Sequence, residues 1–221
     1  MVEEMDSHLR FQRGVTLLGG GGFTEDQLKE SLKLAPELVS ADGGANHLAS
    51  GEYIPKYIIG DCDSVKDVRK WESKGTKIFK IPDQNSTDFD KCLQNINAPK
   101  FICIGFASER LDHFLAVCSS LVNYRQPILV MGKRDLIFHL PNRFKIDLPI
   151  HSRISLYPLK KINSISSKGL KYSLDGIMFS PTDRIGTSNS SVNNQIEISY
   201  SGDGMLVILS SQHLEKVWRL F

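Results

Sequence analysis

Short apolar runs alternate with amphipathic stretches over the first 140 residues. The runs are three to five residues long and rich in branched side chains, which is typical of buried strands. Six strands are predicted: Val15–Leu18, Leu38–Ala41, Tyr57–Ile59, Lys77–Ile81, Phe101–Ile104 and Ile128–Met131. The stretches between them are predicted as helices: Glu25–Leu34, Asn46–Ser50, Val65–Lys74, Asp88–Asn95 and Leu111–Tyr124. This alternation predicts a doubly wound α/β domain with a mostly parallel sheet over residues 1–140.

The pattern changes near Pro141, beyond which β-prone runs are separated by Gly, Asn, Ser and Asp. Here the predicted strands are Ile154–Tyr157, Gly169–Leu174, Gly176–Phe179, Gln195–Tyr200 and Met205–Leu209. No helix is expected in this part, and the polar cluster Thr187–Ser191 is predicted as a loop. Residues 141–221 are therefore expected to form a second domain, an antiparallel β-sandwich.

Composition excludes several classes of protein. The chain of 24.8 kDa has 41% hydrophobic and 24% charged residues and a formal charge of +2, as ordinary globular proteins do. No run of Lys or Arg exceeds two residues, so no nucleic-acid partner is expected. Apolar runs fall short of the ~18–20 residues of a membrane span, and the first 13 residues lack an apolar signal segment. Four cysteines without a C-x-x-C pair favour reduced thiols and a cytoplasmic location.

Candidate chemistry lies where the predicted strands end, because open α/β sheets bind ligands at the carboxyl ends of their strands. Four glycines, Gly19–Gly22, follow the first strand. Their backbone amides can approach a phosphate closely, which makes Gly20 and Gly21 candidate phosphate contacts, although a flexible turn explains the run equally well. The second strand ends at Asp42, a carboxylate beside two further glycines, where an Asx turn is the alternative.

Two carboxylates, Asp61 and Asp63, follow the third predicted strand. Side chains at positions i and i+2 of a loop can reach one divalent ion, and hard oxygen ligands suit Mg²⁺. Alternatively, Asp63 or Ser64 caps the helix expected from Val65. Capping does not explain Asp61, so the metal interpretation is favoured.

The next two strand ends carry charged residues with open alternatives. Asp88 either complements the helix dipole and pairs with Lys91 on the helix surface, or it binds metal while Lys91 contacts phosphate. Arg110 either grips phosphate or pairs with Asp112. At least four aspartates thus meet at one sheet edge, where they repel one another unless a cation lies among them. The residues alone predict a Mg²⁺-dependent enzyme that handles phosphate or nucleotide.

Six motifs follow one another along the chain: Asp42-Gly43-Gly44-Ala45-Asn46, Gly60-Asp61-Cys62-Asp63-Ser64, Asp83-Gln84-Asn85-Ser86-Thr87-Asp88-Phe89, Arg110-Leu111-Asp112-His113, Gly169-Leu170-Lys171-Tyr172 and Thr187-Ser188-Asn189. In this order and spacing they resemble the thiamine pyrophosphokinase family. The resemblance implies transfer of a pyrophosphoryl group from ATP to the hydroxyethyl group of thiamine, giving thiamine diphosphate and AMP. It also implies an α/β nucleotide domain before a β-sandwich domain, and a homodimer with active sites between subunits.

The resemblance also implies roles for single residues. The acidic Mg²⁺ and phosphate centre would be formed by Asp42, Asp61, Asp63 and Asp88, with the metal on Asp61, Asp63 and Asp88. The triphosphate would be surrounded by Gln84, Thr87, Lys91, Arg110 and Asp112. Thiamine would be held by Thr187, Ser188 and Asn189.

Three positions depart from the family pattern. Asn85 stands where the family has Asp, Tyr172 where it tends to have Trp, and Val207 where a Trp stacks on thiamine. Trp218 is expected to pack in the C-terminal tail. Two other functions stay open: a Mg²⁺-dependent phosphohydrolase, in which the acidic cluster activates water, and a non-catalytic sensor of thiamine or nucleotide, which the Val207 departure favours.

Overall fold

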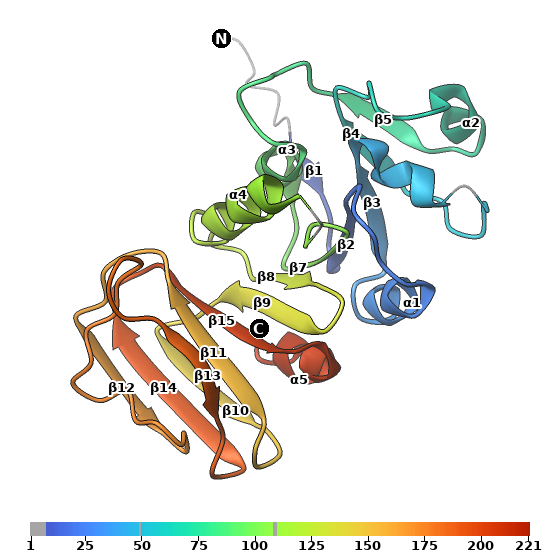
Figure 1. The fold of residues 1–221 in the computed structure, drawn as a ribbon. Helices are drawn as coiled ribbons and strands as arrows, with labels where there is room; N and C mark the ends of the chain where they lie inside the picture. Colours follow the sequence, from blue (N-terminus) through green and yellow to red (C-terminus); the bar gives the residue numbers. More distant parts are fainter. Residues whose placement is uncertain (1–7, 49, 108–109) are drawn as a thin grey trace. The chain divides into compact units, whose positions relative to one another are not determined.

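The computed structural model describes residues 8–48, 50–107 and 110–221. Contacts divide the chain into two units, Met1–Val117 and Cys118–Phe221, and each is described by itself (Figure 1). The domain boundary suggested by the sequence, near Pro141, stays a proposal beside this division. None of the helices in the described ranges is long and apolar enough to cross a membrane.

The first unit is built on five parallel strands in the order β7-β2-β3-β4-β5. Their bounds are β2 Val15–Leu18, β3 Glu37–Ala41, β4 Tyr57–Gly60, β5 Lys77–Lys80 and β7 Phe101–Ile104. Two further short strands, β1 Leu9–Arg10 and β6 Ile96–Asn97, pair in parallel. The helices are α1 Glu25–Leu34, the 3-10 helix η1 Asp42–Leu48, α2 Val68–Ser73, α3 Asp88–Asn95 and α4 Leu111–Leu121, the last of which continues into the second unit.

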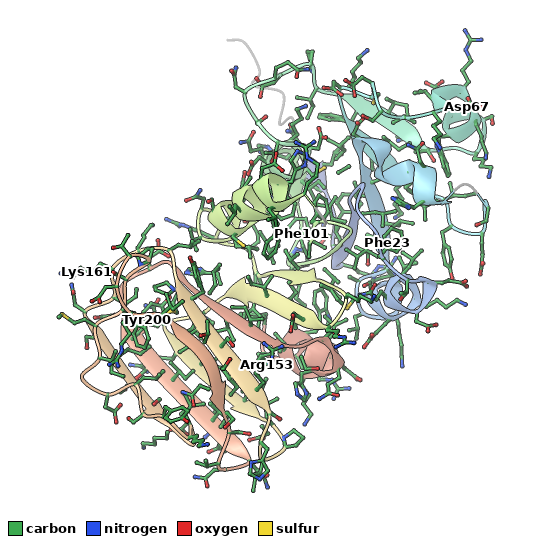
Figure 2. All side chains as sticks on the ribbon, in the orientation of Figure 1. Phe23, Asp67, Phe101, Arg153, Lys161 and Tyr200 are labelled. Carbon is green, nitrogen blue, oxygen red and sulfur yellow. The ribbon has the colours of Figure 1, made fainter. Side chains whose placement is uncertain are left out.

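Burial explains why the central strands are mostly apolar, with Thr16 in β2 and Glu37 and Ser40 in β3 as the exceptions. Every residue of β2, β3 and β7 is buried, because helices cover both faces of the sheet (Figure 1). Phe101 of β7 is 1% exposed among the packed side chains (Figure 2). The edge strand β5 is different, because it begins and ends with the exposed Lys77 and Lys80, and charged residues protect an open edge from pairing.

Capping residues determine where three of the helices begin. Thr24 and Gln27 form a capping box at α1, and the hydroxyl of Thr87 accepts a hydrogen bond from the backbone of α3. The prediction that a helix starts near Val65 is wrong, because α2 begins at Val68 and is capped by Asp67. Asp63 and Ser64 are therefore not needed as caps. In place of the predicted helix Asn46–Ser50 the chain forms η1, and Ala49 lies outside the described residues.

The second unit contains two antiparallel sheets, with strand orders β13-β11-β15-β9-β8 and β10-β14-β12. The bounds are β8 Ile128–Met131, β9 Asp135–His139, β10 Arg143–Asp147, β11 Arg153–Pro158, β12 Ser164–Lys168, β13 Gly186–Ser190, β14 Gln195–Ser201 and β15 Met205–Ser210. The rings of Phe138 on β9 and Phe144 on β10 lie 5.9 Å apart, so the sheets meet through apolar side chains. The predicted fold class, a parallel α/β sheet followed by an antiparallel β-sandwich, is confirmed.

Several predicted elements of this unit are wrong. The segments Gly169–Leu174 and Gly176–Phe179 are not strands, and each contributes one isolated bridge. Gly169 and Gly176 have φ angles of 79° and 72°, the left-handed region in which the chain turns. Thr187–Ser190, predicted within a loop, lies in β13. A helix that sequence analysis did not expect, α5 Leu214–Trp218, buries Trp218 as tail packing.

Candidate active site

Three carboxylates converge at the carboxyl edge of the parallel sheet. Asp42 follows β3, whereas Asp61 and Asp63 follow the adjacent parallel strand β4. One oxygen of each side chain lies within 4.8 Å of the others, and no other such group was found in the described ranges. Gly60 permits this approach, because a Cβ at that position would lie 2.9 Å from the Cβ of Asp42. We call Asp42, Asp61 and Asp63 the acidic group.

Asp42 is the most confined member of the acidic group. The residue is 4% exposed, and its Oδ1 is buried without a hydrogen-bond partner among the described residues. Burial raises the pKa of this carboxyl, and the charges of Asp88 and Asp61 add to the shift against hydrogen bonds from Ser64 and Gly43. A buried, unpaired carboxylate oxygen is costly, and a cation placed against it would remove that cost. The acidic group therefore fits a divalent metal ion with hard oxygen ligands.

Asp61 is held by several donors. Its Oδ1 accepts a hydrogen bond from the backbone N–H of Asp63 at 3.3 Å, and its Oδ2 accepts one from Nε2 of Gln84 at 3.0 Å. These bonds lower the pKa of Asp61, so the carboxyl is held in its ionised form. The hydroxyl of Ser64 donates to Asp63 Oδ1 at 2.9 Å, which orients the third carboxylate.

Asp88 lies beside the acidic group but outside it, and Lys91 connects the two. Nζ of Lys91 is 3.1 Å from Asp88 Oδ1 and 3.5 Å from Asp61 Oδ2. The pairing of Lys91 with Asp88, one of the two alternatives, does form, but the lysine side chain is only 4% exposed, whereas that of Asp88 is 42% exposed. Burial lowers the pKa of Lys91, but both carboxylates raise it, and the net shift is upward.

Two residues that were not predicted as site residues, Asn46 and His47, hold two loops of the site: the loop that follows β4 and the glycine loop, Gly19–Gly22. The side chain of Asn46 donates to the carbonyl of Ser64 at 2.8 Å and accepts from the backbone N–H of Lys66 at 3.0 Å. Nε2 of His47 lies 2.9 Å from the carbonyl oxygen of Gly20. In the sequence, the signal for both residues was that they follow Asp42 by four and five positions. Through them one short helix holds both the glycine loop and the loop of Asp61.

The remaining predicted phosphate contacts are occupied in other ways. The hydroxyl of Thr87 donates to the carboxylate of Asp90 at 2.7 Å. It also accepts a hydrogen bond from the backbone N–H of Asp90 and so caps α3. Arg110 pairs with Asp112 at 2.7 Å, and both side chains are 66% exposed. Of the two alternatives for Arg110, a phosphate contact or a pair with Asp112, the structure has the pair. The backbone N–H of Gly21 donates to the carbonyl of Gly105 at 2.8 Å, while a Cβ added at Gly20 would meet nothing within 4 Å.

The predicted thiamine residues lie together on β13 of the second unit. Thr187 and Ser188 are exposed, and Ser188 has a φ of 62°. Asn189 is 5% exposed, and its amide binds the backbone of Tyr172: Oδ1 accepts from the N–H at 3.0 Å and Nδ2 donates to the carbonyl at 2.7 Å. Tyr172 itself is 60% exposed, whereas Val207 is fully buried. Of the two positions that depart from the family pattern in this unit, only Tyr172 presents a ring at the surface.

Replacing Asp42 by Asn should stabilise the metal-free protein at neutral pH. The pKa of Asp42 is higher in the folded chain than in the unfolded chain, so the folded chain loses stability as the pH rises from the unfolded pKa through the folded pKa. Asn does not ionise, so the variant does not lose this stability. Asn also tolerates the φ of 38° at this position. We expect the free energy of unfolding to increase by about 0.5–2 kcal/mol. Urea unfolding in EDTA at pH 4 and pH 8 measures this free energy for both proteins. If the stability gained by the variant is not larger at pH 8 than at pH 4, burial does not raise the pKa of Asp42.

Two family models match the chain. The catalytic domain of thiamin pyrophosphokinase matches residues 28–131, and its vitamin B1 binding domain matches residues 142–204. Together they cover most of the chain. The first match contains the acidic group, and the second contains Thr187, Ser188 and Asn189.

Curated proteins are similar to this chain in sequence, and solved structures are similar to it in fold. Thiamin pyrophosphokinase 1 of Caenorhabditis elegans is 26% identical over 183 residues, covering 74% of each chain. Thiamine pyrophosphokinase of Saccharomyces cerevisiae is 40% identical over 154 residues, which are 58% of this chain and 48% of that protein. The structure of thiamin pyrophosphokinase from Candida albicans has a TM-score of 0.77 at 20% identity, covering 95% of this chain and 98% of that one. The yeast thiamin pyrophosphokinase structure has a TM-score of 0.78 at 19% identity, covering 100% and 92%.

Proposed function

The chain belongs to the thiamin pyrophosphokinase family, and from this premise we propose that it transfers the pyrophosphoryl group of ATP to the hydroxyethyl group of thiamine. The products are thiamine diphosphate and AMP, and the enzyme is a transferase. The observation that carries this proposal is the acidic group, with the buried and unpartnered Oδ1 of Asp42, at the carboxyl edge of a parallel sheet.

Mg²⁺ is the ion that we propose for the acidic group. Asp61 and Asp63 would hold it, and the unpartnered oxygen of Asp42 is a third oxygen within reach. Asp88, which the sequence resemblance also assigns to the metal, stays a candidate because Lys91 keeps its carboxylate beside Asp61. When bound, the ion would neutralise negative charge on the transferred phosphates.

The residues of the chain then have to position two substrates and remove one proton. The thiamine hydroxyl oxygen forms a bond to the β-phosphorus of ATP, the bond from that phosphorus to the oxygen shared with the α-phosphate breaks, and AMP leaves with that oxygen. Such transfers depend on in-line positioning and charge stabilisation more than on covalent catalysis. An aspartate accepts the hydroxyl proton, while Arg110 and the backbone amide of Gly20 would steady the phosphates. The backbone N–H of Gly21 is already bonded to the carbonyl of Gly105.

An incubation with ATP and Mg²⁺, with and without thiamine, tests the proposed reaction. We expect AMP to accumulate in step with thiamine diphosphate, and only when thiamine is present. ADP, or phosphate released without thiamine, would instead identify the phosphohydrolase. Binding of both ligands without any product would identify the sensor.

We propose further that the enzyme is a homodimer in the cytoplasm. Exposed apolar side chains support the first part, since Tyr172, Met178 and Ile185 of the second unit are 60%, 57% and 42% exposed. All four cysteines are free, which supports a reducing compartment. Sedimentation equilibrium measures the first property, and a monomer at micromolar concentration would contradict it.

Replacing Asn189 by Ala should raise the Michaelis constant for thiamine about tenfold and leave that for ATP unchanged. The change leaves the backbone N–H and carbonyl of Tyr172 without their partner, which costs about 1–3 kcal/mol in the ordered segment. Asn193→Ala is the matched control, because that residue is exposed and its hydrogen bond uses the backbone. Initial rates measured over a range of thiamine and ATP concentrations give both Michaelis constants. Equal rises in the two constants would show that Asn189 does not belong to the thiamine site.

A further inference from the structure

Lys91 is an unusual lysine, because it is buried beside the acidic group. The residue is 3% exposed, and among the described residues no other lysine or arginine is buried. An ammonium group taken out of water needs charged partners within hydrogen-bonding distance. The groups around Nζ of Lys91 therefore identify the charges that this lysine balances.

The partners of Lys91 are two carboxylates from distant segments. Asp88 begins the same helix, α3, whereas Asp61 comes from the loop after β4. Nζ lies 3.1 Å from Asp88 Oδ1 and 3.5 Å from Asp61 Oδ2. Gln84 donates to that same oxygen of Asp61 at 3.0 Å. The segment from Gln84 to Lys91 thus holds one oxygen of Asp61 with two donors.

These contacts differ from those of a lysine that binds phosphate. A phosphate ligand must reach Nζ, but the side chain of Lys91 is 4% exposed, and Nζ already lies against two carboxylates of the protein. Arg110 offers the contrast, because its side chain is 66% exposed and its partner Asp112 is equally exposed. Arg110 is thus more accessible to a triphosphate than Lys91, whose charge is directed at the protein's own carboxylates.

We propose that Lys91 is a positioning residue, the internal counter-cation of the acidic group, which couples Asp61 to Asp88 and opposes the entry of a divalent ion. The inference rests on the proposed function only in taking these carboxylates to hold such an ion. Lys91 keeps the carboxylates together in the metal-free protein. Because it carries a positive charge beside them, it also lowers their affinity for a divalent cation.

The substitution Lys91→Gln tests this role, since it removes the charge and keeps a hydrogen-bond donor. We expect the dissociation constant for Mn²⁺, measured by electron paramagnetic resonance without ATP or thiamine, to fall about tenfold. Lys91→Arg keeps the positive charge beside the carboxylates and should bind Mn²⁺ within about twofold of the original chain. Lys33→Gln, an exposed lysine on α1, should leave Mn²⁺ binding unchanged.

The outcomes separate this inference from the proposed reaction. A Lys91→Gln protein with unchanged Mn²⁺ affinity and a raised Michaelis constant for ATP would make Lys91 a phosphate contact and overturn the inference. Weaker Mn²⁺ binding in both the Gln and Arg variants would also overturn it. If the original chain binds Mn²⁺ but forms no AMP, the proposed reaction fails, and the Mn²⁺ comparison still decides the role of Lys91. Circular dichroism confirms that each variant is folded.

Discussion

Replacing Asp61 by Asn is expected to lower kcat by about 10²–10³-fold at saturating ATP, thiamine and Mg²⁺. Asp61 is the member of the acidic group with the most donors around it, since Asp63, Gln84 and Lys91 all approach its two oxygens. An amide removes the negative charge and also turns one acceptor into a donor. That donor then faces the backbone N–H of Asp63 on one side, or Gln84 and Lys91 on the other, so neither orientation restores the native hydrogen bonds.

The rate of AMP formation over a range of Mg²⁺ concentrations measures this effect. Asp26→Asn is the matched control, because Asp26 is exposed on α1 and the same change there should leave turnover unaltered. Normal turnover of the Asp61 variant at limiting Mg²⁺ would show that the acidic group does not serve the reaction.

Burial on both faces is what made the parallel strands predictable. β2 and β7 have the predicted bounds, because each is a run of buried and mostly apolar residues that is followed by a glycine. The polar strands β12 and β13 gave no such signal, since each buries a single side chain, Ile165 and Asn189 respectively. β10 does alternate, with Phe144 and Ile146 buried between charged residues, but it is not among the strands predicted from the sequence.

The acidic group could be predicted because strand ends follow directly from strand assignment. Parallel strands place Asp42 and Asp61 at one edge whatever the details of packing. The burial of Lys91 could not be predicted in this way, since it depends on how α3 packs on β3 and β4. Helical spacing alone gave its pairing with Asp88, and only the fold adds Asp61 as a second partner.

The departure at Asn85 also has a structural explanation. Its backbone N–H and its side-chain amide both donate to Oδ1 of Asp83, at 3.0 and 3.1 Å. The hydroxyl of Ser86 donates to the other oxygen of Asp83, and these bonds lower the pKa of that carboxyl. An Asp at position 85 would replace the donating amide with a second negative charge. In this chain Asn85 therefore shapes the turn before α3.

Replacing Gly44 by Ala is expected to lower the free energy of unfolding of the first unit by about 1–3 kcal/mol. A Cβ at this position would lie 2.5 Å from the carbonyl oxygen of Leu18, 2.9 Å from Oγ of Ser40 and 3.0 Å from the carbonyl carbon of Gly19. Two of these atoms belong to the backbone at the end of β2, which has neighbouring strands on both sides and cannot give way. Relief has to come from η1, which carries Asp42 and Asn46, so Mn²⁺ binding should weaken as well.

The two tryptophans allow the change at Gly44 to be measured in the first unit alone. Trp71 is buried in α2 and Trp218 in α5 of the second unit, so urea unfolding followed by fluorescence in a Trp218→Phe background reports on the first. Gly22→Ala is the matched control, since a Cβ there meets nothing within 4 Å and the backbone is not in the left-handed region. We expect the midpoint to fall for Gly44→Ala and to stay or rise slightly for Gly22→Ala, because alanine restricts the unfolded chain. Equal midpoints would mean that η1 can move away from β2, and the close packing of Gly44 against the end of β2 would then not be what fixes the position of η1 and Asp42.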